Sequence, residues 1–325
     1  LGASEMSIKG ISNVQEGVKK LTGISIAEAG QLIVRGLGDR YSSTTLNGLP
    51  IASPNPDNKL IPLDIFPSSA VQNITVSKVY EASAFADYSG AHVDISTKEG
   101  GTKDFFNVSF GTGGKVGTVF GEFYQMDRAN TMFKTPSMDR KAMDLPLSDY
   151  RQYSRNHNIF PTTFEVNKSS AMPDLNGSFG FGRTFRLGSN KMDVLATFGI
   201  DTDNESLDNA YVRTFEASGT EMSRFDYDSF TQTLKMAGLA SVGYSFRKAD
   251  RVGFSAFYAR NAVDSYMARQ GHDEEGIRLK GSNQNSHVYE LQNYQLAGHH
   301  VFGMWDTDWS GSYSKTSSEE PDRRQ

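Results

Sequence analysis

Hydrophobic and polar residues alternate along most of the chain after about residue 105. In KMDVLATFGID, Lys191 to Asp201, every second side chain is apolar: Met192, Val194, Ala196, Phe198 and Ile200. Because successive side chains of a strand point to opposite faces, this pattern predicts strands with one apolar face and one polar face. We predict eight strands, over residues 105–112, 117–126, 174–187, 190–202, 230–247, 250–262, 286–303 and 305–315.

The predicted connections alternate between tight turns and long polar excursions. Tight turns fall near Gly113-Gly114, Ser189, Lys248-Ala249 and Gly303-Met304, and the excursions cover 127–173, 203–229 and 263–285. This rhythm is typical of an outer-membrane barrel, whose strands need only about 9 to 11 residues to cross the bilayer. A soluble β-sandwich has the same alternation with its apolar side turned inward, so that alternative stays open.

One arginine conflicts with the pattern. Arg183 falls on the apolar side of its predicted strand, where a midplane position would cost about 2 to 4 kcal/mol. Either the residue lies near the membrane interface and extends its charge to water, or a bulge shifts the strand register.

Residues 1 to about 98 have a mixed pattern. Ser12-Asn13-Val14-Gln15 resembles a capping box, Val14, Val18 and Leu21 share a helical face, and Gly23 is placed to end the helix. Short apolar runs predict strands at 31–34, 45–51, 74–80 and 92–97, with a short helix at 67–73. The chain therefore divides into a mixed α+β domain at 1–98 and antiparallel strands at 99–325.

Two groups of residues in this domain resemble the plug domain of TonB-dependent outer-membrane receptors. The first group comprises Arg35, Gly36, Gly38, Arg40 and Tyr41, followed by Asn47, Gly48 and Pro50 within LNGLPI. The second is the segment from Ser69 to Gly100, which contains the Tyr-x-Gly-Ala turn with Tyr88 and Gly90. Glu320-Pro321-Asp322-Arg323-Arg324 also resembles a motif that one branch of the family carries after an early barrel strand.

The resemblance implies a plug domain followed by an antiparallel transmembrane β-barrel in the outer membrane of a Gram-negative bacterium. Eight strands would leave no room for a plug, whereas family members enclose it in about 22 strands. We therefore expect an N-terminal portion of a receptor, through truncation, incomplete coordinates, or completion by a second polypeptide, and no TonB box is recognisable before the plug. Arg35 and Arg40 are expected to pair with wall carboxylates such as Asp193, Glu122 and Asp201.

The resemblance also implies partners and a mechanism. The family binds a scarce small ligand outside the cell, such as a siderophore, glycan, peptide or vitamin, and imports it with energy from the TonB-ExbB-ExbD system. Outer-membrane lipid, and a surface lipoprotein or other outer-membrane subunits, are further expected partners. A structural or assembly subunit without import activity is the alternative function.

Composition excludes several other classes of function. The chain has 33 basic and 38 acidic residues, a net charge of −5, so nucleic acid is not an expected partner. It has no cysteine for disulfides, thiolate metal sites or nucleophilic catalysis. The glycine-rich stretch GLGDRYSST lacks the Gly-Lys-Ser/Thr ending of a phosphate-binding loop. No catalytic motif is present, and we expect neither an enzyme nor a cofactor.

The remaining candidate sites are weaker. The loop Pro54 to Asn58 could form part of the ligand face through Asn55, Asp57 and Asn58, with simple surface exposure as the alternative. Carboxylates at 201–205 and the run His272 to Glu275 could bind a cation but are more typical of solvated loops. His299 and His300 should point to opposite faces, so they cannot chelate one metal together. Trp305, Trp309 and Tyr313 fit an interfacial aromatic girdle, or else core packing.

Overall fold

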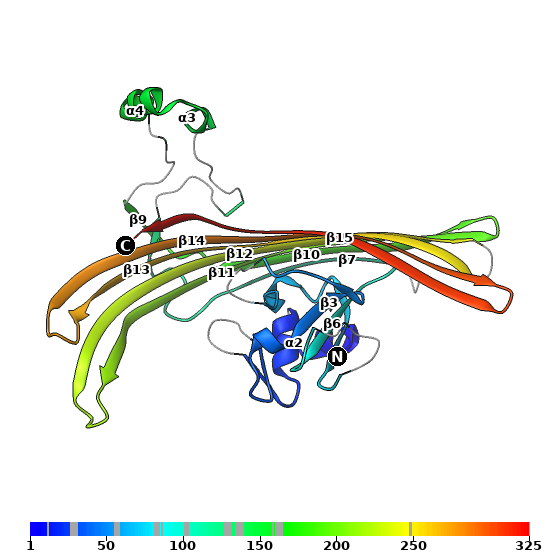
Figure 1. Ribbon diagram of the computed structural model, residues 1–325, viewed down its shortest axis with the longest axis horizontal. Helices are drawn as coiled ribbons and strands as arrows, with labels where there is room; N and C mark the ends of the chain where they lie inside the picture. Colours follow the sequence, from blue (N-terminus) through cyan, green and yellow to red (C-terminus); the bar gives the residue numbers. More distant parts are fainter. Residues whose placement is uncertain are drawn as a thin grey trace.

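A computed structural model describes residues 1–11, 13–26, 32–54, 59–80, 85, 87–100, 104–126, 132–133, 140–157, 159, 165–246 and 249–324. Figure 1 shows an N-terminal domain on the concave side of a long antiparallel sheet. Among the described residues, no helix is both long and apolar enough to cross a membrane.

A four-stranded sheet organises the N-terminal domain. Its order is β4-β3-β6-β5, from β3 (Ser43–Leu46), β4 (Leu49–Pro50), β5 (Val71–Ser77) and β6 (His92–Thr97). Around it lie α1 (Ala3–Ile8), α2 (Val14–Lys19), η1 (Asp39–Tyr41), η2 (Leu63–Ile65) and the pair β1 (Ile24–Ile26) and β2 (Leu32–Val34). The parallel pair of β3 and β6 brings together segments about 50 residues apart, and Ile74, Val93 and Ile95 are buried beside Val14 and Val18.

Two details of this domain differ from the sequence prediction. The N-cap of α2 is Asn13, whose side chain accepts a hydrogen bond from the Glu16 amide at 3.0 Å, so the cap falls one residue after Ser12. The predicted helix at 67–73 is wrong, because β5 already begins at Val71. The β-branched residues that follow pair with β6 and favour a strand there. Gly23 has a φ of +74°, as its predicted role at the helix end requires.

The second part of the chain is a wall of seven antiparallel strands in the order β15-β14-β13-β12-β11-β10-β7. The strands are β7 (Phe105–Gly113), β10 (Asp174–Leu187), β11 (Asn190–Phe215), β12 (Glu221–Phe246), β13 (Asp250–His272), β14 (Arg278–Phe302) and β15 (Trp305–Arg324). β7 and β15 form the two edges. The described strands therefore form an open sheet and not a closed eight-stranded barrel. An open sheet was predicted, because a closed barrel of eight strands would leave no room for a plug.

The inner face of the wall packs on the N-terminal domain. Cross-strand pairing aligns Thr197, Leu239, Phe257 and Asn293 in one row, and all four are buried. Leu239 and Phe257 belong to the same hydrophobic cluster as Phe66 of the N-terminal domain. The ring of Phe66 stacks on that of Phe257 with centroids 5.4 Å apart. The two parts of the chain thus share one core.

The outer face of the wall carries a band of exposed apolar side chains. Val108, Phe179 and Phe198 are directly paired across β7, β10 and β11, and they are 66, 39 and 45% exposed. A second row joins Val242, Phe254 and Leu296, which are all exposed. Arg260 and Glu290 also lie on the outer face, further from the tight turns, and form an ion pair there. The exposed apolar rows therefore lie mainly in the half of the wall nearest the tight turns.

Arg183 lies in this band close to its tight-turn end. Its strand pairs with both neighbours without a register shift, so no bulge explains the residue. The guanidinium lies 5.2 Å from the centre of the Phe185 ring, only a few residues before the strand ends at Leu187. A position near the end of the band suits an arginine that extends its charge to water.

The predicted strand at 117–126 does not belong to the wall. β7 pairs directly with β10, and only Glu122–Met126 form a strand, β8, which pairs with β9 (Val166–Ser170) as a separate hairpin. Figure 1 shows α3 (Arg140–Met143) and α4 (Leu147–Asn156) of this excursion on the opposite side of the wall from the N-terminal domain. The predicted tight turn near Gly113-Gly114 is wrong, because the long excursion of residues 114–173 follows β7 there. The tight turns near Gly188 and Gly303 lie at the opposite end of the wall.

Two of the predicted excursions are instead strand extensions. β11 and β12 continue through 203–229 to a turn at 216–220, and β13 and β14 continue through 263–285 to a turn at 273–277. Strands of 23 to 26 residues exceed the roughly 9 to 11 needed to cross a bilayer. The wall therefore extends well beyond its apolar band.

Candidate functional site: the N-terminal domain and its contacts with the wall

The Asn47-Gly48 turn connects β3 to β4 and also contacts the wall. Asn47 and Gly48 have φ angles of +53° and +75°, which this turn requires and which asparagine and glycine tolerate. The Asn47 carboxamide oxygen accepts the Thr97 amide at 2.8 Å, and its nitrogen donates to the Gln295 side chain at 2.8 Å. Gln295 in turn donates to the Leu46 carbonyl at 2.8 Å. A turn predicted from sequence is thus a docking point on β14.

The two groups of family residues meet at the Tyr41 carbonyl. That oxygen accepts hydrogen bonds from the amides of Ser89 and Gly90, at 2.9 and 2.7 Å. A Cβ on Gly90 would come within 3.1 Å of the same oxygen, so the close approach requires glycine. The Tyr88 hydroxyl donates to the Val79 carbonyl at 3.1 Å. Tyr41, Tyr88 and Gly90 therefore hold the two halves of the domain together.

The Arg35-Gly36 pair forms an exposed turn after β2. Arg35 and Gly36 have φ angles of +51° and +81°, and Val34 and Leu37 close the turn through reciprocal backbone hydrogen bonds. Gly38 follows, and its carbonyl accepts the Tyr41 amide at 3.1 Å across η1, which contains Arg40. Pro50 is exposed at the end of the β3–β4 hairpin, opposite Thr45.

The expected ion pairs of Arg35 and Arg40 with the wall are wrong. Both side chains are exposed, and neither forms an ion pair with another described residue. Of the expected partners, Glu122 pairs with Lys168, and Asp193 lies 3.9 Å from Arg251. The nearby cations of these two carboxylates therefore belong to the wall and its excursion and not to the N-terminal domain.

Asp64 makes the ion pair that does join the domain to the wall. Its carboxylate lies 2.8 Å from the Lys235 ammonium, with side chains only 20 and 30% exposed. The Asn261 amide donates to the same oxygen at 3.4 Å. Sequence reasoning did not identify Asp64, because a single Asp within η2 forms no motif and its partners lie on β12 and β13. Asn55, Asp57 and Asn58 fall outside the described residues.

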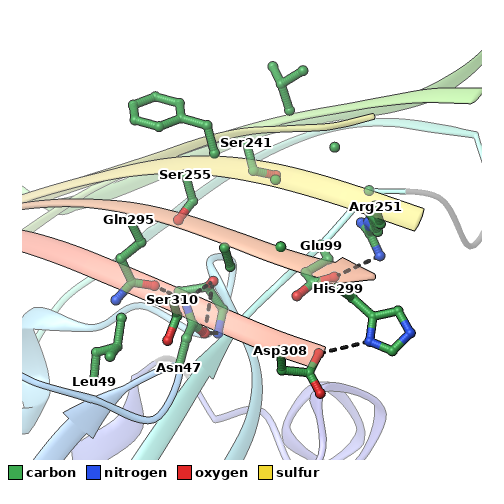
Figure 2. Close-up of a pocket in the computed structure, with 18 of the residues that line it drawn as sticks. Asn47, Leu49, Glu99, Ser241, Arg251, Ser255, Gln295, His299, Asp308 and Ser310 are labelled. Atoms are coloured by element: carbon green, nitrogen blue, oxygen red, sulfur yellow. Dashed lines mark hydrogen bonds and ion pairs between the residues drawn. The ribbon is translucent and has the colours of Figure 1, made fainter. Parts of the chain in front are cut away.

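A cavity of about 400 Å³ lies between the domain and the inner face of the wall, at the tight-turn end. Figure 2 shows Asn47 and Gln295 on one side of it, and Arg251 with Glu99 on another, 3.2 Å apart. Lys98 also lines the cavity, and burial lowers the pKa of its ammonium. The cavity wall is thus mixed in charge and lies where the N-terminal domain continues into β7.

The other candidate sites contain ion pairs and hydrogen bonds with neighbouring residues. Lys115 lies 2.9 Å from both Asp203 and Glu205, so a protein cation already pairs with two carboxylates of the acidic stretch at 201–205. Asp273 accepts two backbone amides of its turn. His299 and His300 contact different carboxylates, Asp308 at 2.8 Å and Asp250 at 3.4 Å.

Comparison with known proteins identifies the N-terminal domain. The sequence model of the TonB-dependent Receptor Plug Domain matches residues 1–91. The domain that docks on the wall is therefore a TonB-dependent receptor plug domain, and the chain continues from it into an antiparallel partial barrel. TonB-dependent receptors are transport proteins and not enzymes. No match was found among curated proteins.

Solved structures that resemble the chain include siderophore receptors. They include the ferric enterobactin receptor PfeA of Pseudomonas aeruginosa, with 11% identity, a TM-score of 0.35, and coverage of 95% of this chain and 48% of that one. The siderophore receptor PirA of Acinetobacter baumannii has 9% identity, a TM-score of 0.35, and coverage of 98% and 58%. The alcaligin receptor FauA of Bordetella pertussis has 9% identity, a TM-score of 0.34, and coverage of 100% and 57%. The chain spans about half the length of these structures.

Proposed function

We propose that the chain is part of a TonB-dependent importer in the outer membrane of a Gram-negative bacterium. Residues 1–98 form the plug and residues 99–325 the first strands of a plugged barrel, which further strands, on the order of 22 in all, would complete. The observation that carries the proposal is the seating of a plug domain on the inner face of a wall whose outer face bears an exposed apolar band.

The position of the band suits a membrane-spanning region. Its rows include that of Phe198, and the row with the ion pair of Arg260 and Glu290 is the next one on the side away from the tight turns. A band about 25 Å tall with polar extensions on one side is the arrangement of outer-membrane barrels, where the tight turns face the periplasm. Outer-membrane lipid is thus the first partner, and the strand extensions and the 114–173 excursion would face the outside.

The proposed activity is capture of a scarce ligand by external segments, followed by import driven by TonB-ExbB-ExbD. A siderophore, a glycan, a peptide or a vitamin would each suit this role, and Asn55, Asp57 and Asn58 are candidates for the ligand face of the plug. Asp64, Asn47 and their wall partners are the contacts that must break or rearrange if the plug moves. Neither a cofactor nor a catalytic group is part of the proposal.

Growth on a limiting nutrient tests the import activity. Deleting the gene should abolish growth on one nutrient of the four classes, deleting tonB should do the same, and restoring the gene should recover growth only in the tonB-positive strain. Growth that is unaffected by tonB while an outer-membrane complex loses its integrity would instead favour the alternative, a structural or assembly subunit with a surface lipoprotein or other outer-membrane subunits as partners.

A further inference from the structure

The hairpin between β14 and β15 brings a histidine and two aspartates together on the inner face of the wall. His299 is directly paired with Asp308, and Asp306 lies two residues before Asp308 on the same face of β15. Ligand atoms of the three side chains all lie within 4.8 Å of one another, and within the described part of the chain no other such group occurs. We propose that His299, Asp306 and Asp308 form a binding site for a divalent transition-metal ion.

The spacing of these atoms suits a small metal ion. The Nδ1 atom of His299 lies 2.8 Å from an Asp308 oxygen and 3.4 Å from an Asp306 oxygen. Ligands about 2.0 to 2.2 Å from a tetrahedral zinc ion are separated from one another by roughly 3.3 Å. The three side chains therefore need only small rotations to surround an ion, and imidazole with carboxylates is a donor set that Zn²⁺, Ni²⁺ and Cu²⁺ accept.

The local charge also favours a cation. With a neutral imidazole, the group carries two negative charges, and a protonated imidazole would neutralise only one of them. Arg251 is paired with His299 across the strands, but its guanidinium is directed to Glu99 at 3.2 Å (Figure 2). Asp306 and Asp308 are 66 and 80% exposed, so an ion can reach them from solvent.

The position of the site gives it a structural consequence. His299 and Asp308 also line the cavity between the plug and the wall. Three protein ligands leave at least one coordination position open, which water or a donor from the cavity can occupy. A bound ion would join β14 to β15 beside their tight turn and would place a positive charge where the plug continues into the wall. The site does not depend on the proposed import activity.

Metal titration of the purified, metal-free protein in detergent tests the site. We expect one Zn²⁺ per chain by calorimetry at neutral pH, and one equivalent of Cu²⁺ to give an EPR spectrum with hyperfine coupling to a single imidazole nitrogen. His299→Gln should remove the nitrogen coupling. It should also weaken Zn²⁺ binding by at least about tenfold, because even the loss of a residue that only supports a metal ligand typically lowers metal affinity by that factor. Asp306→Asn and Asp308→Asn should each weaken binding in the same direction.

A matched control lies on the neighbouring position of the same strand. His300 also contacts a carboxylate, Asp250 at 3.4 Å, and forms no ion pair with a second carboxylate among the described residues. His300→Gln should leave both the Zn²⁺ affinity and the Cu²⁺ spectrum unchanged. Binding that does not saturate at one ion, or a nitrogen coupling that persists in His299→Gln, would overturn the proposal. Heat-modifiable migration on a gel verifies that each variant is folded before titration.

Discussion

At the scale of single residues, the family pattern identifies positions that the backbone requires but not the contacts that those positions make. Asn47 and Gly48 were predicted as a turn, and their positive φ angles agree. The bond from Asn47 to Gln295 spans 248 residues, and no local pattern contains it. Likewise, the sequence indicated the turn near Gly303. The pairing of His299 with Asp308 follows from that turn only if the two strands pair residue by residue away from it, as they do in the structure.

Substitution of Asn47 separates the two roles of this residue. Asn47→Gly keeps the backbone freedom and loses the side-chain hydrogen bonds, whereas Asn47→Ala loses both. We expect Asn47→Gly to speed hydrogen exchange in β3 and β6, equivalent to about 1 to 3 kcal/mol of local stability, and Asn47→Ala to exceed it. Hydrogen-exchange mass spectrometry of the two variants measures the difference. Equal protection in Asn47→Gly and the wild type would show that the contact with Gln295 does not stabilise the plug.

The buried ammonium of Lys98 predicts a dependence of stability on pH. Burial lowers its pKa in the folded state, while the unfolded chain keeps a value near the ordinary 10.4, as a rough reference. Between the two values the unfolded state binds more protons, so stability rises with pH through that window. Below it, the cost of burying the charge is fully present.

Lys98→Met removes this titration. The variant should be more stable than the wild type at neutral pH, and the advantage should shrink as the pH approaches the ordinary lysine value. Urea unfolding in detergent, followed by tryptophan fluorescence at several pH values, measures both curves. A constant difference between the curves would indicate that the introduced methionine acts through packing and not through the loss of charge.

At the scale of elements, the period-two pattern predicted strands well only where one face is apolar. β10 spans the predicted 174–187, and β6 spans the predicted 92–97. In contrast, β11 and β12 continue beyond the predicted bounds, where apolar residues such as Tyr211 and Val212 are adjacent and the strict alternation is lost. The strand predicted at 117–126 forms only over Glu122–Met126, and its partner is β9 in the same excursion and not a wall strand. The local pattern predicts which face of a strand is apolar, but it does not predict which strand it pairs with.

The N-cap of α2 illustrates the same limit and gives a prediction for one helix. The sequence predicted Ser12 with Gln15 as the capping pair, whereas in the structure the Asn13 side chain accepts the Glu16 amide. Asn13→Ala should therefore destabilise the plug by about 1 kcal/mol, whereas Asn13→Ser should retain most of the stability because serine is also a good cap. Urea unfolding compares the variants. Equal losses in both would mean that the helix is not stabilised through this side chain.

At the scale of the whole molecule, one core joins two parts of the chain that the sequence showed as separate. Phe66 and Phe257, Asp64 and Lys235, and Asn47 and Gln295 fix the plug on the wall through apolar, ionic and amide contacts. The division into a mixed domain and antiparallel strands was predictable from the change of pattern near residue 100. The docking geometry was not, because each contact pairs residues about 170 or more positions apart.

The apolar band supplies a test of the membrane assignment. If Phe198 faces the bilayer, as proposed, Phe198→Arg should cost about 2 to 4 kcal/mol, and the fraction of heat-modifiable protein recovered from outer membranes should fall. Tyr211→Arg is the matched control, because Tyr211 is 64% exposed on the same strand but lies in the extension beyond the band. There the arginine remains in water and recovery should match the wild type. Similar recovery of the two variants would mean that lipid does not cover the face containing Phe198, and the proposed barrel would lose its main support.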